Sequence, residues 1–568
     1  MASNHKLLVT SIDQVKSLAS SATLDLNSNQ CKYLSHGVQV TTKPFLREDF
    51  RTKIAEYSKY DTPRYSRLSK ALVHLYSIVK RAENLMQRCC ASKPGLTWQQ
   101  RALTLFAMED DVWDIIIHVR WWASILSMLV DVGGPSSKPS ILERVREANQ
   151  AFQPSLKDEL QDAAKEDKQT LLNKVNTEMK DGDFGKKKFR NPDYLLLLQV
   201  KALLIGKDED PTSQLNDFRH DGRYSLVGQG SFGVVHRVKW CGYGCVLKQY
   251  DGADDIEVKS MKRFHHPHIV RFFRHWRDEK CSKYKSHLLM ERMEMDLEEH
   301  IKSALTKQKK LGKSEPFSDP VAIHIMLQVI NAIWHMQSKG IVHRDLKPKN
   351  VLVRLSGKNV ADELATEGYV EVKLGDFGIA KEDMETSHEG ALTRNTGTTL
   401  YRAPELSSLD YIKVGVTKLP HQLDIWSFGI MCSQILTGKQ PFEDAPLARY
   451  EGCPLPSDLK GYVDKNGRPS LPDHCPDYLR FCIQNCWELK PENRPKASDL
   501  WRMLRVAQLR SLGLIDQNYD FFSFTDLSNN FVELNPLRPR QNQGQNGQPS
   551  NKQALQRRNF RKSKSKGP

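Results

Sequence analysis

The spacing of apolar residues divides the 568-residue chain into regions of different character. Over residues 7–205, apolar positions recur at three- and four-residue intervals, and Tyr65, Leu68 and Leu72 begin the clearest such stripe. A stripe of this kind lies on one face of a helix and must pack against another apolar face. The pattern therefore predicts an all-α helical bundle over residues 1–206.

The pattern changes after this region. Residues 207–221 are rich in charged residues and include a proline, so they are predicted to form a linker. From Tyr224, apolar and β-branched runs separated by glycines predict short strands. From Val321, helical periodicity returns, interrupted by short strand-like runs. We therefore expect an α+β domain over residues 222–512, with a β-rich lobe before a mainly helical one.

The C-terminal part carries much of the charge. After a short extension over residues 513–534, residues 535–568 contain nine of the 16 net positive charges and no acidic residue, and their composition predicts disorder. The rest of the chain is only mildly basic, which argues against sequence-specific nucleic-acid binding. The final "RRNFRKSKSKGP" fits a nuclear import signal, a contact with an anionic surface or a solvated tail.

Hydropathy and cysteine usage indicate a reducing compartment and no membrane span. The most apolar window, residues 115–130, is interrupted by His118 and Arg120 and predicts a buried helix rather than a transmembrane segment. The first residues lack the pattern of a secretory signal, so we expect a cytoplasmic location, with the nucleus as an additional one. The 11 cysteines are expected to be reduced thiols, and the pairs 241/245 and 482/486 fit core positions better than a zinc site.

A glycine-rich segment begins the β-rich region. The pattern G-x-G-x-x-G-x-V is formed by Gly228, Gly230, Gly233 and Val235. An ordinary glycine hairpin would satisfy this pattern alone. Fifteen residues after Gly233, a strand-like run ends at Lys248, and Glu257 begins a helical run nine residues later.

A second motif is much more specific. Residues 343–350, "HRDLKPKN", match the pattern H-R-D-L-x-x-x-N, and "DFG" at 376–378 and "APE" at 403–405 follow in order. Five specified residues would match by chance roughly once in several thousand chains of this length. The region from about 224 to 509 thus resembles the catalytic domain of protein kinases. This resemblance implies a bilobal protein kinase fold, here preceded by the helical bundle.

The resemblance assigns a role to each motif residue. It implies that Asp345 accepts the proton of the substrate hydroxyl, that Lys347 balances charge on the transferred group, and that Lys248 meets the ATP phosphates while paired with Glu257. Asn350 and Asp376 would hold Mg²⁺ ions. The expected nucleotide-binding residues are Gly228, Gly230, Gly233, Val235, Val246, Lys248, Met290, Glu291 and Met293.

Further residues indicate the substrate class and the subgroup. Lys347 and Thr398 are typical of serine/threonine kinases, and "CW" at 486–487 with "PENRP" at 491–495 resembles the signature of the tyrosine-kinase-like group. Arg494 would then pair with Glu405. The N-terminal bundle resembles the helical module that precedes kinase domains in some plant proteins. The resemblance implies a signalling kinase that binds ATP, Mg²⁺ and a protein substrate.

Two departures change the expected pocket and loops. Val246 replaces the usual alanine and Met290 occupies the gatekeeper position, so we expect a narrow ATP pocket. Asn350 and Asp376 are 26 positions apart, about twice the usual separation, which predicts a surface hairpin insertion.

The sequence offers several sites of regulation and is compatible with three roles for the bundle. Activation by phosphorylation is expected in the activation segment, at Thr393 first, with Thr386, Ser387 and Thr396 as alternatives. The bundle could dock a protein partner, engage a membrane or cover the active site, and partner docking is favoured because the basic, exposed apolar face of a membrane helix is not evident. The alternative to an enzyme is a pseudokinase-like scaffold that signals through the bundle.

Overall fold

In the computed structural model, the N-terminal helices and the domain that follows them belong to one unit, Met1–Leu537. The residues that the structure describes are 2–58, 63–91, 97–105, 108–131, 155–184, 191–205, 225–230, 233–240, 243–251, 256–277, 286–355, 364, 368–377, 381–382, 399–407, 420–447, 449–450, 453–454 and 456–514. The predicted linker at 207–221 and the basic tail lie outside these residues, and the predicted domain boundaries stay predictions.

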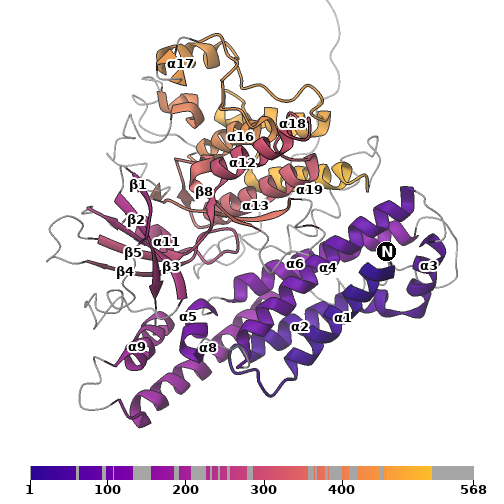
Figure 1. Ribbon diagram of the computed structural model, residues 1–568, viewed down its shortest axis with the longest axis vertical. Helices are drawn as coiled ribbons and strands as arrows, with labels where there is room; N and C mark the ends of the chain where they lie inside the picture. Colours follow the sequence, from indigo (N-terminus) through magenta and orange to yellow (C-terminus); the bar gives the residue numbers. More distant parts are fainter. Residues whose placement is uncertain are drawn as a thin grey trace, which may run out of the picture. The chain divides into compact units, whose positions relative to one another are not determined.

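The N-terminal region is helical, as the apolar stripes predict (Figure 1). Its helices are α1 (Ala2–Ala19), α2 (Ser28–Thr42), α3 (Glu48–Ser58), α4 (Pro63–Cys89), α5 (Trp98–Leu105), α6 (Met108–Asp131), α8 (Ser155–Asp181) and α9 (Pro192–Ile205). Helix α4 packs against α1 and α6, while α2 packs against α6 and α8. The apolar stripes thus meet one another in a shared core.

Helix α6 contains the most apolar window of the chain. By length and composition this helix could cross a membrane, but 83% of its most apolar window is buried inside the protein. Trp121 and Trp122 are 1% and 2% exposed. The structure therefore gives α6 a place in the core, and the predicted buried helix is confirmed.

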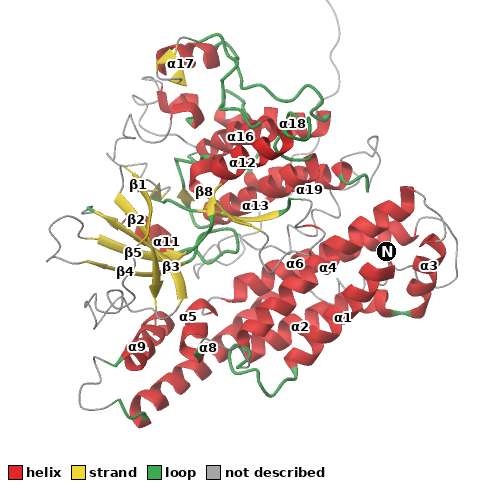
Figure 2. Ribbon diagram, viewed as in Figure 1, coloured by secondary structure: helices red, strands yellow, loops and turns green. Residues whose placement is uncertain are grey.

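A five-stranded antiparallel sheet follows the bundle in sequence (Figure 2). Its strands lie in the order β1 (Ser225–Gly230), β2 (Gly233–Trp240), β3 (Tyr243–Tyr250), β5 (Ser286–Glu291) and β4 (Phe272–Arg277), with helix α11 (Ile256–Lys262) between β3 and β4 in sequence. The register places Val246 opposite Met290 and Lys248 opposite Leu288.

The second lobe is mainly helical, so the predicted α+β fold class with a preceding all-α bundle is confirmed. Helix α13 (Asp319–Ser338) is its centre and packs against α19 (Ala497–Ser511), α16 (His421–Thr437) and strand β9 (Val370–Leu374). This lobe also contains β6 (Met295–Asp296), α12 (Leu297–Lys309), β7 (Ile341–Val342), β8 (Val351–Leu355), β10 (Lys381–Glu382), α17 (Pro456–Asp464) and α18 (Asp477–Cys486).

The strands on both sides of the predicted insertion between Asn350 and Asp376 form a hairpin. Strands β8 and β9 pair antiparallel from Val351 opposite Leu374 to Leu355 opposite Val370. Most of the connection lies outside the described residues, but Leu364 and Tyr369 at its base are 5% and 1% exposed. The base of the insertion is therefore packed rather than solvated.

Candidate active site

Two predicted catalytic residues, Asp345 and Lys347, and the predicted metal ligand Asn350 lie between β7 and β8. The Lys347 Nζ donates to Asp345 Oδ2 at 2.6 Å, and the Asn350 Nδ2 donates to the same oxygen at 3.1 Å. The Asn350 Nδ2 also donates to the Asp345 backbone oxygen at 2.7 Å. Two side chains, two and five residues further along the chain, thus fix the orientation of the Asp345 carboxylate.

Asp376 and Lys248 form the second part of the site. Lys248, on β3, donates to Asp376 Oδ1 at 3.0 Å, although 128 residues separate them in sequence. Burial alone would raise the pKa of Asp376, but the Lys248 ammonium outweighs this effect and lowers the pKa below its ordinary value. Asp376 is therefore held as a carboxylate.

The two parts are joined through backbone groups. The Gly375 N–H donates to the Asn350 carbonyl at 2.8 Å, and the His343 Nε2 lies 3.0 Å from the Gly375 carbonyl. Asp376 has a φ of +58°, in the left-handed region that non-glycine residues seldom adopt. Such backbone strain is found most often at functional sites, where the surrounding structure enforces it.

A buried carboxylate fixes the backbone of the catalytic loop through hydrogen bonds. Asp424, on α16, is fully buried and accepts hydrogen bonds from the His343 and Arg344 N–H groups at 2.8 and 2.9 Å. Burial raises the pKa of Asp424. Arg344 has a φ of +72°, so these two bonds hold a strained turn in place. The motif at 343–350 alone does not reveal this support.

The glycine-rich segment forms the β1–β2 hairpin. Gly230 pairs with Gly233, and Val235 lies opposite Lys248 on β3. Gly233 has a φ of +126°, and a Cβ there would lie 2.2 Å from the Gln249 carbonyl oxygen, so only glycine fits. Gly228 lies within β1, opposite Val235.

Glu257 lies in the first turn of α11, which also follows β3 in sequence. Its side chain is outside the described residues, so the predicted pair with Lys248 stays a prediction. The loop residues 231–232, Gly378, Thr398 and the four candidate phosphorylation sites Thr386, Ser387, Thr393 and Thr396 also lie outside the described residues.

The predicted hinge contains an ion-pair network that sequence reasoning missed. The Glu291 carboxylate accepts from Arg354 at 2.6 Å and from Lys373 at 2.9 Å. Burial opposes ionisation of Glu291, but the two cations lower its pKa well below the ordinary value. Its carboxylate is committed to β8 and β9, so a nucleotide contact by Glu291 would have to use the backbone. Met290 is half-buried beside Val246, and Met293 is 8% exposed.

The predicted Glu405–Arg494 pair is present. Arg494 Nη1 and Nη2 donate to Glu405 Oε1 and Oε2 at 2.6 and 2.8 Å, and the two residues are 3% and 4% exposed. Arg494 also donates to the carbonyls of Glu488 and Gln422. A bidentate pair of this kind fixes the segment after "APE" against the helical lobe.

The donor set of this site fits a hard divalent cation. Asp376 offers carboxylate oxygens, and Asn350 uses its Nδ2 on Asp345, which leaves its amide oxygen for a ligand. Carboxylate and amide oxygens suit cations such as Mg²⁺. The Lys248 ammonium supplies positive charge on the other side of Asp376.

Comparisons with known proteins agree with this arrangement. Residues 223–504 match the protein kinase domain. The chain is 26% identical over 508 residues to a light-sensor protein kinase of Ceratodon purpureus, across 84% of this chain and 36% of that protein. It is 31% identical over 230 residues to an Aurora kinase of Candida glabrata, across 38% of this chain and 54% of that protein.

A third relative is mitogen-activated protein kinase kinase kinase 7 of Homo sapiens, 24% identical over 311 residues, 52% of this chain and 44% of that protein. The chain thus spans less than two thirds of each of these relatives. Residues 223–568 are only 346 of 568, so the similarity to the Ceratodon protein, over 84% of the chain, extends into the N-terminal helices. Sequence similar to part of the N-terminal helices therefore accompanies the kinase-like region in that protein.

Proposed function

We propose, on the premise that the chain belongs to the protein kinase family through residues 223–504, that it phosphorylates serine or threonine hydroxyls of protein substrates with ATP. The observation that carries this proposal is the convergence of Lys347 and Asn350 on the Asp345 carboxylate, beside the Lys248–Asp376 pair. The similarity to Aurora kinase and to mitogen-activated protein kinase kinase kinase 7 supports the same activity. Lys347 favours serine or threonine over tyrosine.

Asp345 would act as the proton acceptor. It is 8% exposed, and the Lys347 and Asn350 hydrogen bonds to its Oδ2 fix the orientation of the carboxylate that would accept the proton of a hydroxyl. Lys347 then lies next to the reacting group and can balance negative charge that develops on it. Positioning and charge neutralisation are the main demands of phosphoryl transfer.

Lys248 and Asp376 would serve the phosphates. We propose Mg²⁺ as the divalent cation, held by Asp376 and Asn350, where it would neutralise phosphate charge. Lys248 lies 3.0 Å from Asp376 and would bind phosphate oxygens of ATP.

The environment of Arg344 favours the proposal that phosphorylation activates the protein. Its side chain is 8% exposed, and burial lowers the pKa of its guanidinium. Among the described residues, Asp424 receives its backbone N–H, but no carboxylate bonds its guanidinium. A phosphate on the activation segment would supply the missing negative charge, and Thr393 remains the first candidate.

Autophosphorylation of the full chain tests the proposed activity. The Lys248→Met and Asp345→Asn variants should each lose at least about a hundredfold in rate, because each removes a group that acts directly on the phosphates or the hydroxyl. A Lys460→Met variant, changed on the exposed surface of α17, should keep the wild-type rate. Equal rates for all four proteins would instead favour a scaffold that signals through its helical bundle. Mapping phosphosites on the active protein would locate the activating residue.

The location of the protein is proposed to be cytoplasmic, with a nuclear pool directed by the basic tail. The bundle is proposed to present a partner-docking surface on its outer helices. Deleting residues 553–568 from a fluorescent fusion should remove the nuclear pool and leave the cytoplasmic signal.

A further inference from the structure

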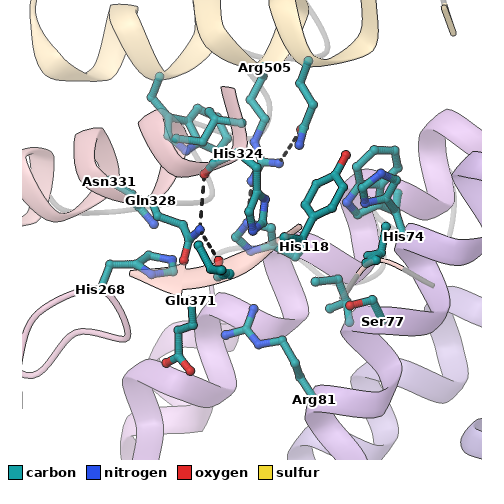
Figure 3. Close-up of a pocket in the computed structure, with 18 residues that line it drawn as sticks. His74, Ser77, Arg81, His118, His268, His324, Gln328, Asn331, Glu371 and Arg505 are labelled. Carbon is teal, nitrogen blue, oxygen red and sulfur yellow. Dashed lines mark hydrogen bonds between the residues drawn. The ribbon is translucent and has the colours of Figure 1, made fainter. Parts of the chain in front are cut away.

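A cavity of about 80 Å³ lies between the N-terminal helices and the kinase domain (Figure 3). Its wall combines residues of α4 and α6 with residues of α13, β9 and α19. A cavity needs only about 10–15 Å³ by this measure to hold one water molecule. It is thus large enough for a small polyatomic ligand.

Arg505 is the unusual residue of this cavity. It is 3% exposed and descends from α19, while Arg81 approaches from α4 on the opposite side (Figure 3). The Arg505 guanidinium donates to the Gln508 Oε1 at 3.1 Å and contacts the His118 Nε2. It also lies over the rings of Trp121 and Trp501. All of these partners are neutral.

Within the part of the chain that the structure describes, no carboxylate bonds Arg505, and its Nε has no hydrogen-bond partner. Burial lowers its pKa to about 10, which leaves the guanidinium charged at neutral pH. A buried charge without an opposite charge is costly. The position therefore indicates a missing anion.

The other charges at the wall are matched. Arg81 is paired with Asp114 at 3.0 Å, and Glu371 is paired with Arg354 at 3.2 Å. His118 lies between Arg505 and Asp114, with its Nδ1 2.8 Å from the Asp114 carbonyl. Since Asp114 is already engaged by Arg81, one positive charge remains in excess, at Arg505.

Asn331 gives a second, independent indication. It is 6% exposed, lines the cavity from α13, and its Oδ1 has no hydrogen-bond partner among the described residues. Its amide can also donate, as can the imidazoles of His74 and His324 on the same wall. Buried polar atoms are nearly always satisfied, so the donors on this wall suit an oxyanion, while the Asn331 Oδ1, which only accepts, calls for a protonated oxygen such as the O–H of hydrogen phosphate.

We infer that this cavity binds a small oxyanion, of the size of phosphate or a short carboxylate, with Arg505 as its charged partner. The oxyanion would contact both the bundle and the kinase domain, so its binding would stabilise the contact between them. This inference does not depend on catalysis, because none of the lining residues belongs to the site around Asp345.

Thermal unfolding of the full chain tests the inference. Inorganic phosphate or acetate is added to a chloride buffer at constant ionic strength, and Tm is followed. For the wild type, we expect Tm to rise and then saturate with at least one of the two anions. The anion that gives this response tells whether the cavity binds a phosphate or a carboxylate. The Lys248→Met protein should respond equally, which excludes the ATP site as the cause.

Two variants locate the effect. Arg505→Met should abolish the response, whereas Arg502→Met, on the same helix and paired with Asp499 near the surface, should preserve it. Asn331→Asp places a permanent carboxylate in the cavity, so it should raise Tm without added anion and remove the response. The inference is overturned if neither anion shifts the wild-type Tm, which would mean that water alone fills the cavity, or if Arg505→Met responds like the wild type.

Discussion

At the scale of single residues, the structure repeatedly pairs a buried charge with several fixed donors or acceptors. Asp424 receives two backbone N–H groups, and Glu405 receives both arms of Arg494. In each case the loop that bears the functional residues is held by one residue from a helix or a neighbouring segment. Buried groups of this kind are expensive to disrupt, because the partner left behind stays uncompensated.

The Glu405–Arg494 pair gives a prediction at this scale. Arg494→Met should cost about 3–5 kcal/mol of unfolding free energy, because the Glu405 carboxylate would remain buried without its partner. Replacing both residues, as Glu405→Leu with Arg494→Met, should recover part of that loss. Urea unfolding followed by tryptophan fluorescence measures all three proteins. As a control, Lys460→Met breaks an exposed pair with Asp464 and should change stability by no more than roughly 0.5 kcal/mol.

At the scale of elements, the helical lobe depends on close packing of α16 against α18 and the residues after it. A Cβ built on Gly429 of α16 would lie 2.6 Å from the Cys486 Cβ and 2.7 Å from the Trp487 Nε1. Both neighbours are buried, at 0% and 3% exposure, so neither can move away freely. Glycine is needed at position 429 because a side chain there would collide with the end of α18 and the residue after it. Its backbone conformation does not require glycine.

Gly429→Ala should therefore destabilise the protein by about 1–3 kcal/mol through overpacking. Gly461 of α17 is the matched control, since a Cβ there meets nothing within 4 Å. Because alanine favours a helix over glycine, Gly461→Ala should be neutral or stabilising by up to roughly 1 kcal/mol. Equal effects of the two substitutions in urea unfolding would contradict this account of the α16–α18 contact.

The sequence predicted elements and motifs well because both depend on local spacing. The apolar stripe of α4, the hairpin of β8 and β9 and the contents of residues 343–350 all follow from residues close together in the chain. The partners of Glu291 could not be predicted in this way, because Arg354 and Lys373 lie 63 and 82 residues away. The positive φ values of Arg344 and Asp376 also depend on supports from distant segments.

At the scale of the whole molecule, the bundle and the kinase domain form one compact unit. Lys70 of α4 donates to the Leu512 carbonyl at 3.3 Å, and Arg271, just before β4, donates to Asp111 of α6 at 2.8 Å. The Arg271 N–H also donates to Glu291 in the hinge at 3.2 Å. The bundle is thus connected to the hinge through one residue, a relation that no local pattern in the sequence indicates.

Tyr369, just before β9, belongs to the same contact. The ring of Tyr369 lies 5.5 Å from His74 of α4 and 5.0 Å from His324 of α13. His74 in turn stacks on Trp122 of α6 at 4.3 Å. Tyr369 therefore lies where the two domains meet, with a histidine of the bundle on one side and a histidine of the helical lobe on the other.

These histidines predict how stability depends on pH. Burial lowers the pKa of His74, His268 and His324 from 6.5 to about 3, and that of His118 to about 4. An imidazole with a lowered pKa stays neutral in the folded protein while its unfolded form gains a proton below pH 6.5. Stability is therefore complete above pH 6.5 and is lost as the pH falls toward these folded-state values, by about 1 kcal/mol per pH unit for each histidine.

The charged groups that face these histidines do not reverse this direction. Arg81, Arg505 and Lys373 lower the histidine pKa values further, and Asp114 opposes them. The pKa of Asp114 is itself below its ordinary value of 3.8, because His118 and Arg81 outweigh its burial, so its own contribution is lost only below that pH. Tm measured from pH 7 to pH 4.5 should fall steadily, and His74→Gln should make the slope shallower. His474→Gln changes an exposed histidine and should leave the slope of Tm against pH unchanged. If His74→Gln has the same slope as the wild type, the histidines of this contact do not control the pH dependence.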